Sequence, residues 1–344
     1  MKRIIYWLTA SAVILTLQAC VSTSRVLSET AMLPPQPAEA HQSELDDVPA
    51  YINEFKEKYK DLTLEINNQK YDFSFMDRVN TSDSRKSLLI LEYESGIVLV
   101  GFNNEKEELA EFLQIREGDT SDLQAILDNP DRLFVAQNIH LKEQNGNAIY
   151  VASLTDNTTQ ESYNLRLVIN ESLVDAGNST LEVKGTSAEI IADNVGAITY
   201  IQVQALITDH PEVDTLILKN IGGSLNDAIN MHTGRLIREA GLTTRVPADG
   251  EIRSGGVDLF SSGLVRQYET GSKIGVHAWC CTEDGKTADK LSRNHNAHNA
   301  QLIYFREMLG TNLGAEFYFF TIEAAPFDDI HLMTQEETEH FLLN

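Results

Sequence analysis

Two residues whose types suit nucleophilic chemistry, Ser254 and His277, lie in the C-terminal half of the chain. Ser254 opens the turn Ser254-Gly255-Gly256 before a helix predicted over Val257–Ser262, and His277 ends a strand predicted over Gly271–Val276. One helix and one return strand therefore bring the imidazole back alongside the hydroxyl. A serine activated by a histidine base is the arrangement of a nucleophilic hydrolase.

A second glycine turn, Gly222-Gly223-Ser224, stands between a strand predicted over 214–219 and a helix. Ser224 followed by Asp227 is a helix-capping pattern, and the free N–H groups of a helix start can bind negative charge. The N–H after Ser254 points the same way as the serine, so one turn can supply nucleophile and oxyanion donor. Each feature has a simpler interpretation: a tight turn for the glycine pair, and a plain helix cap for Ser254.

The elements around these turns alternate between strand and helix. The segment 179–185 reads as a strand and turn, 194–208 as a helix that Pro211 ends, and 242–246 as a strand. Leu216 to Leu218 are consecutive apolar residues, as expected for a strand covered on both faces. This order predicts an α/β layer architecture for residues 179–344.

The pieces 218–224, 254–256 and 275–277 resemble the ClpP-like members of the ClpP/crotonase superfamily, in particular their bacterial envelope branch. The resemblance covers 179–344 and implies ClpP/crotonase-like repeated ββα layers. It also implies that Ser254 is the nucleophile and His277 the base. By the same match, the N–H groups of Gly222 and Gly255 form the oxyanion hole.

The resemblance further implies an aspartate shortly before the last helix. Aligning the helix cap at Thr334 places Ile330 at that position, one residue after Asp329. Asp329 is therefore the predicted third member of a Ser-His-Asp triad, with Asp328 as the second choice. The other interpretation is a pair of acidic residues in a surface loop.

Two departures from the family pattern bear on activity. Asn220-Ile221 stands where the family has Ser-Pro, and Arg253 precedes the serine where the family has a small residue. Arg253 either assists Ser254 or binds an acidic substrate group, or it indicates that hydrolysis has been lost.

Residues 46–178 predict a smaller α+β domain with antiparallel pairing. Gln144-Asn145-Gly146 is a hairpin-turn signal. Helices are expected over 48–59, 105–115 and 120–127, and strands over 70–76, 87–102, 139–141, 148–154 and 163–169. The acidic residues here are scattered over predicted solvent faces, so substrate selection or partner docking is the default expectation for this domain.

The first residues predict export. Lys2 and Arg3 precede an apolar run, Ile4–Leu17, that is shorter than the roughly 20 residues needed to cross a bilayer. The run ends Leu17-Gln18-Ala19-Cys20, which resembles the bacterial lipobox. We therefore expect a signal peptide over 1–19, a lipidated Cys20 that attaches the chain to the membrane, and a tether over 20–45. Val21 favours the outer membrane, facing the periplasm. An ordinary signal or an uncleaved anchor is the alternative.

Composition excludes several classes of partner. The formal net charge of −24 repels phosphate backbones and argues against nucleic-acid binding. Cys280 and Cys281 predict a vicinal or interchain disulfide, with a catalytic cysteine as the alternative. A helix is predicted over 288–309, and His295 and His298 lie on it at i and i+3. They suit a polar solvated face better than a zinc site, so no metal is expected. No P-loop or Rossmann motif is present, so no cofactor is expected.

The sequence thus predicts an envelope lipoprotein with an ATP-independent serine peptidase domain that acts on peptides or unfolded proteins. The alternative is an inactive ClpP-like module that binds peptides or proteins. Acyl-CoA chemistry of the crotonase type ranks last, because CoA is cytosolic. The aromatic run Phe317 to Phe320 predicts core packing or a contact in a homo-oligomer.

Overall fold

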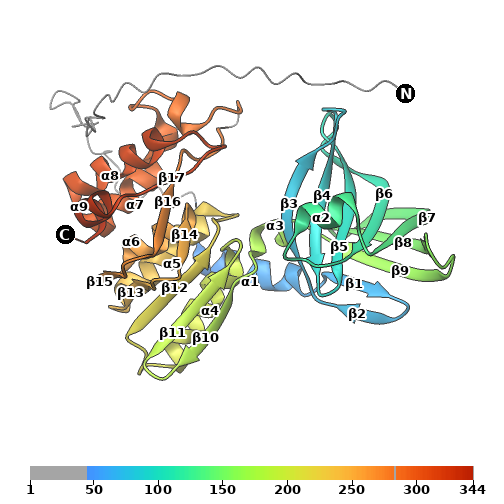
Figure 1. Cartoon of the computed structure of the whole chain (residues 1–344), viewed down its shortest axis with the longest axis horizontal. Helices are drawn as coiled ribbons and strands as arrows, with labels where there is room; N and C mark the ends of the chain where they lie inside the picture. Colours follow the sequence, from blue (N-terminus) through green and yellow to red (C-terminus); the bar gives the residue numbers. More distant parts are fainter. Residues whose placement is uncertain (1–44, 283, 344) are drawn as a thin grey trace, which may run out of the picture. The chain divides into compact units, whose positions relative to one another are not determined.

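A computed structural model describes residues 45–282 and 284–343 (Figure 1). The predicted signal peptide (1–19), the lipidation site Cys20 and all of the tether (20–45) except its last residue lie outside these residues. Two sheets organise the described chain, one of nine strands and one of eight. None of the helices within the described ranges has the length and apolarity to cross a membrane.

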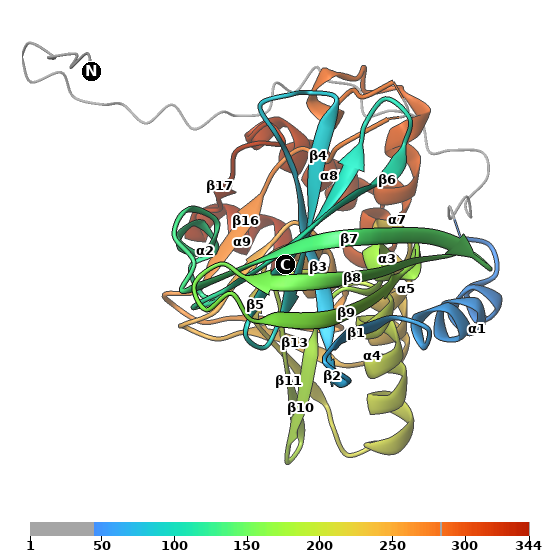
Figure 2. The ribbon, with the colours of Figure 1, turned by 90° about the vertical axis from the view of Figure 1, so that its right-hand side faces the viewer.

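The first sheet is antiparallel throughout, in the order β2-β1-β9-β8-β7-β6-β5-β4-β3. Its strands are β1 (Thr63–Ile66), β2 (Gln69–Tyr71), β3 (Phe73–Asn80), β4 (Lys86–Tyr93), β5 (Gly96–Asn103), β6 (Glu108–Glu117), β7 (Arg132–Gln144), β8 (Asn147–Asp156) and β9 (Ser162–Ile169). The two ends of this order, β2 and β3, are separated in the chain by Asp72 alone. The sheet must therefore curl round on itself, and Figure 2 shows β7, β8 and β9 side by side on its curved wall.

Alternating side chains fill the inside of the curl. Along β8, Tyr150, Ala152 and Leu154 are buried while Val151 is exposed, which is the period of a strand with one covered face. The predicted hairpin turn is confirmed between β7 and β8, where Asn145 and Gly146 have φ of 53° and 77°. Positive φ at both central residues is what a two-residue hairpin loop requires.

The helix predicted over 105–115 is wrong, because β6 (Glu108–Glu117) occupies this segment. Its glutamate, leucine and alanine residues favour a helix. Pairing with β5 and β7 overrides that preference, and Leu113 and Ile115 enter the core with the two-residue period of a strand. The other predicted helices here are found as α1 (Val48–Tyr59) and α2 (Leu123–Asp128), capped by Asp47 and Asp122.

The second sheet is mostly parallel and confirms the predicted α/β class. Its path is β10-β11-β12-β14-β16-β17, and β13 pairs with β12 and β15. The strands are β10 (Thr180–Lys184), β11 (Ser187–Ala192), β12 (Thr215–Ile221), β13 (Thr243–Val246), β14 (Glu251–Arg253), β15 (Val265–Tyr268), β16 (Lys273–Val276) and β17 (His331–Leu332). The first half of β12 pairs with β13 and its last residues pair with β14, so the sheet divides into two branches at this strand.

The helices of this part are α3 (Ser172–Ala176), α4 (Ala197–Asp209), α5 (Asp227–Glu239), α6 (Gly255–Ser262), α7 (Asn299–Leu309), α8 (Thr311–Ala324) and α9 (Gln335–Leu342), with short 3-10 turns at Ala288–Lys290 and Asn296–His298. The N-cap of α5 is Asn226, whose side chain accepts from the Ile229 N–H at 3.1 Å. The predicted cap Ser224 lies two residues earlier. The helix predicted from Ala288 starts only at Asn299.

The helix α1, which the sequence assigned to the N-terminal domain, packs against helices that follow residue 178. Ile52 and Phe55 share a buried cluster with Ala197, Tyr200 and Ile229. The Tyr51 hydroxyl donates to Asp175 at 3.1 Å and accepts from the Asn226 side chain at 3.2 Å. The domain boundary at 178/179 stays a prediction.

Candidate active site

Ser254 occupies a sharp turn between β14 and α6. Its backbone has φ 48° and ψ −118°, a conformation that residues with a side chain rarely adopt. The surrounding bonds hold it: the Ser254 N–H donates to the Gly275 carbonyl at 3.0 Å, and its carbonyl accepts from Val257 N–H at 2.8 Å. Strain of this kind persists where the fold over-determines it and is concentrated at functional sites. The turn presents a half-buried serine at the start of a helix.

The two glycine turns meet in space. A β-carbon on Gly223 would lie 3.8 Å from Ser254 Cβ, and one on Gly255 would lie 2.5 Å from Ser224 Cβ. Each glycine thus faces the serine of the other turn. This confirms the convergence that the order of strands and helices predicted, and it explains why Gly255 must lack a side chain.

The backbone donors near Ser254 differ from those expected. The Gly222 N–H donates to the Ala192 carbonyl at 3.1 Å, so it is occupied. The next residue, Gly223, is buried, and its N–H has no hydrogen-bond partner among residues 45–282 and 284–343. Gly255 is the first residue of α6, where the N–H has no acceptor within the helix. The N–H groups of Gly223 and Gly255 are therefore the available pair.

His277 directly follows β16, which pairs in parallel with β14 and sets Gly275 opposite Arg253. Because parallel strands end at the same edge, the histidine and Ser254 emerge at one edge of the sheet. Desolvation by burial lowers the pKa of His277, and the Asp227 carboxylate and nearby backbone act in the opposite direction. Its Nδ1 is buried and has no hydrogen-bond partner in the described chain. A neutral imidazole of this kind can accept a proton.

The predicted triad is not joined by hydrogen bonds within the described residues. The Ser254 hydroxyl has no partner there, and none of these bonds joins it to His277. Asp329 is exposed, and its Oδ1 accepts from the N–H of Ile330 at 2.8 Å. Neither Asp329 nor Asp328 contacts His277 through a hydrogen bond in this region. The triad role of Asp329 stays a prediction.

Two carboxylates lie close to the serine turns, the half-buried Asp227 and the buried Asp258, and the sequence did not single them out for chemistry. Asp227 accepts a hydrogen bond from the Ser224 hydroxyl. Asp258, on α6, is 4% exposed and lies close enough to Asp227 for their charges to interact. Desolvation raises the pKa of both groups, in Asp258 well above its usual range. Asn230 bridges Asp258 to the turn, because its side-chain amide donates to the Gly255 carbonyl at 3.0 Å and to Asp258 Oδ2 at 3.4 Å.

The residue before the nucleophile turn, Arg253, forms an ion pair with Glu251, which also binds Lys273 at 3.0 Å. The Arg253 guanidinium is exposed, and the Glu251 carboxylate partly neutralises its charge. No described hydrogen bond joins Arg253 to Ser254.

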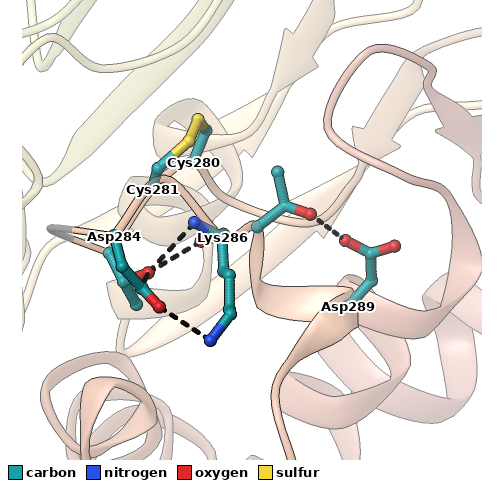
Figure 3. Close-up of a disulfide and its surroundings, with 7 residues drawn as sticks. Cys280, Cys281, Asp284, Lys286 and Asp289 are labelled. Carbon is teal, nitrogen blue, oxygen red and sulfur yellow. Dashed lines mark hydrogen bonds and ion pairs between the residues drawn. A yellow bond between two sulfur atoms is a disulfide. The ribbon is translucent and has the colours of Figure 1, made fainter.

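Cys280 and Cys281 form a disulfide between sequence neighbours, as Figure 3 shows. This selects the vicinal alternative over a bond between chains. Both cysteines are exposed, and they precede a turn in which Thr282 bonds Asp284. The pair therefore lies three residues beyond His277, outside the set of groups around Ser254.

His298, spaced with His295 as a possible zinc ligand and expected on a polar face, instead lies in the protein core. Among residues 45–282 and 284–343, no group of three or more histidine, cysteine or acidic side chains has the geometry of a metal site. His298 is 1% exposed, with its ring nitrogens 2.6 Å from the Tyr318 hydroxyl and 3.1 Å from the Ser292 carbonyl. It is a satisfied core histidine.

Comparison with known proteins returned only distant likeness. No family model matches the chain, and no curated protein of similar sequence was found. Among solved structures, an enoyl-CoA hydratase from Geobacillus kaustophilus has 13% identity and a TM-score of 0.32, over 48% of this chain and 66% of its own. An enoyl-CoA hydratase from Bacillus anthracis has 12% identity and a TM-score of 0.33, over 48% and 68%. Pseudomonas aeruginosa DspI has 12% identity and a TM-score of 0.32, over 48% and 70%.

Two of these three structures are named as enoyl-CoA hydratases, and none of the three is named as a peptidase. The aligned region spans about two thirds of the length of the Geobacillus enzyme. With TM-scores near 0.3 the likeness is coarse, and we draw neither reaction nor substrate from it.

Proposed function

We propose that the C-terminal domain is a serine hydrolase in which Ser254 is the nucleophile and His277 the general base. The observation that carries this proposal is the backbone of Ser254, held at φ 48° between β14 and α6 with its hydroxyl unbonded within the described residues. A plain helix cap needs no such conformation, and the Ser254 side chain makes no capping bond.

The chemistry follows from the groups around this turn. His277 removes the proton from the Ser254 hydroxyl as its oxygen attacks a substrate carbonyl, and the carbonyl π electrons move onto the oxygen. The N–H groups of Gly223 and Gly255 donate to that oxyanion. Collapse of the tetrahedral intermediate expels the leaving amine, which takes the proton from His277. Water then cleaves the acyl-serine by the same route in reverse.

The substrate class comes from the sequence. The resemblance of the turns to ClpP-like proteins favours a peptidase. A lipidated Cys20 would hold the protein in the bacterial envelope, a compartment that lacks ATP. Peptides or already unfolded chains are therefore the proposed substrates. The membrane anchor, the periplasmic location and a homo-oligomeric state belong to this proposal.

A fluorophosphonate probe tests the nucleophile directly. Folded protein should become labelled, and peptide mass spectrometry should place the adduct on Ser254. Ser254→Ala should abolish labelling, whereas Ser262→Ala should not, because the Ser262 hydroxyl is buried and bonds the Leu259 carbonyl at 2.7 Å. Folded wild type that stays unlabelled while a serine hydrolase control reacts excludes this function.

A second function has two observations in its favour. Ser254 and His277 share no hydrogen bond among the described residues, and Arg253 is committed to Glu251. Both facts suit a peptide-binding module that has lost turnover. Peptide binding that is equal in wild type and Ser254→Ala, with no product from either, would select this function over the first.

A further inference from the structure

We propose that Asp227, at the first position of α5, is the carboxylate that orients His277 and stabilises its protonated form. The catalytic consequence rests on the proposed function, but the electrostatic interaction between the two side chains does not. Asp227 would act through His277, so it is a positioning residue.

The first support is where the fold puts Asp227. Its carboxylate accepts from the Ser224 hydroxyl, and Ser224 lies against Gly255, the residue that follows Ser254. Asp227 keeps part of its surface accessible, yet protein atoms surround its carboxyl group. The start of α5 therefore places the Asp227 carboxylate close to the turn that holds Ser254, with Ser224 between them.

The second support is the hydrogen bonding of the His277 ring, in particular of its Nδ1. This nitrogen is buried and no hydrogen bond of good geometry reaches it in the described chain, although the backbone of Ala278 and Phe327 lies near enough to raise the pKa of the ring. Leaving a buried polar atom poorly paired is costly. In a histidine base, this is the nitrogen that a carboxylate binds when the other nitrogen faces the serine.

The third support comes from the groups that face His277. The charge that acts on the histidine is Asp227, from α5. The loop before β17 contributes the Phe327 ring, centred 5.8 Å from the imidazole, and its backbone. Asp258, from α6, has its own pKa raised by Asp227 and is not among the groups that act on His277. The exposed Asp329 already binds the Ile330 N–H. The described carboxylate with an electrostatic effect on His277 is therefore Asp227.

The Ser224 bond has a role in this arrangement. The Ser224 hydroxyl donates to the Asp227 carboxylate and so favours its charged form, whereas burial favours the neutral form. Ser224 thus helps to keep Asp227 ionised when a proton moves from Ser254 to His277. The imidazolium then forms beside a negative charge.

The test is the pKa of His277 measured by NMR titration of the histidine ring signals, assigned with His277→Gln. Asp227→Asn keeps the side-chain shape and should lower the His277 pKa by about half a unit or more, because an opposite charge is lost. Asp329→Asn is the matched control and should leave it unchanged. No change in Asp227→Asn, or a fall in Asp329→Asn instead, overturns the proposal.

A second variant covers a failure of Asp227→Asn to fold, checked by circular dichroism. Ser224→Ala removes the bond that favours the Asp227 charge, and it should shift the His277 pKa in the same downward direction; an unchanged value counts against the proposal. These titrations need no turnover. Absence of Ser254 labelling in wild type would defeat the proposed function alone, whereas an unchanged His277 pKa would defeat this inference alone.

Discussion

Gly255 faces Ser224 so closely that a β-carbon on the glycine would lie 2.5 Å from Ser224 Cβ and 2.7 Å from its Oγ. This contact packs the start of α6 directly against the turn before α5. It is the structural basis for the convergence of the two glycine turns, and everything proposed about Ser254 depends on it.

Replacing Gly255 tests that contact. Gly255→Ala would force the turns apart, since real Cβ atoms do not approach within 3.0 Å of such neighbours. Overpacking of this kind costs about 1–3 kcal/mol of unfolding free energy. We expect thermal unfolding several degrees lower than in wild type and a loss of fluorophosphonate labelling at Ser254.

Gly223→Ala is the matched comparison, because its nearest neighbours would lie at 3.7 and 3.8 Å, which is ordinary contact. It should unfold close to the wild-type temperature. Equal unfolding temperatures and equal labelling for wild type and Gly255→Ala would contradict the close approach of the two turns.

The pH dependence of Ser254 labelling reports on His277. A base must be neutral to accept a proton, and burial lowers the His277 pKa below its usual value of 6.5. The labelling rate should therefore be more than half-maximal at pH 6.5 and reach half its maximum only at a lower pH. His277→Gln should slow labelling and flatten the profile. A half-maximal rate above pH 6.5 would show that the histidine is not desolvated in this way.

The fold was predictable from sequence where local pattern and pairing agree. The hairpin at Asn145-Gly146 and the buried strand β12 follow from turn chemistry and apolar runs. The strand β6 was missed because its residue types favour a helix and only its neighbours β5 and β7 make it a strand. No single-sequence pattern contains that pairing.

Part of the candidate site was predictable from the sequence and part was not. The positions of Ser254 and His277 follow from chain order, because parallel strands return each loop to one edge of the sheet. Asp227 was interpreted as part of a helix cap, and the motif Ser-x-x-Asp gives no reason to prefer chemistry over capping. Its interaction with His277 appears only once α5 and β16 are placed in three dimensions.

The buried Asp258 predicts an unusual pH dependence of stability. Desolvation and Asp227 raise its folded-state pKa, so above about pH 4 the unfolded chain releases a proton that the folded protein retains. The folded state then binds more protons, and this group lowers the unfolding free energy as pH rises, by at most about 1.4 kcal/mol per pH unit until the folded-state pKa. Asp258→Asn removes the effect and should gain stability over wild type between pH 5 and 8.

Urea unfolding of both proteins at several pH values measures this difference, and the other titrating groups cancel in the comparison. Asp329→Asn, at an exposed position, should run parallel to wild type. A constant offset between Asp258→Asn and wild type across the pH range would mean that Asp258 is ionised in the folded state throughout.

The cysteine pair gives a prediction about oligomers. Since Cys280 and Cys281 bond to each other within one chain, non-reducing electrophoresis should show no covalent dimer through these residues. Alkylation without reductant should leave both unmodified, and reduction should expose two thiols. A covalent dimer that disappears in the Cys280→Ser, Cys281→Ser double variant would favour the interchain bond instead.

The helix α5, which carries Asp227, packs against α7. The close approach of the two helices is possible because residue 234 is a glycine. A β-carbon there would lie 2.0 Å from the Tyr304 hydroxyl, which donates to the Asp258 carbonyl at 2.7 Å. Alanine favours a helix over glycine by about 1 kcal/mol, but this clash should outweigh that gain, so Gly234→Ala should destabilise the protein. In a Tyr304→Phe background the hydroxyl is gone, and the cost of Gly234→Ala should shrink. Urea unfolding of the four proteins of this double-mutant cycle measures the coupling, and strictly additive effects would place the two side chains out of contact.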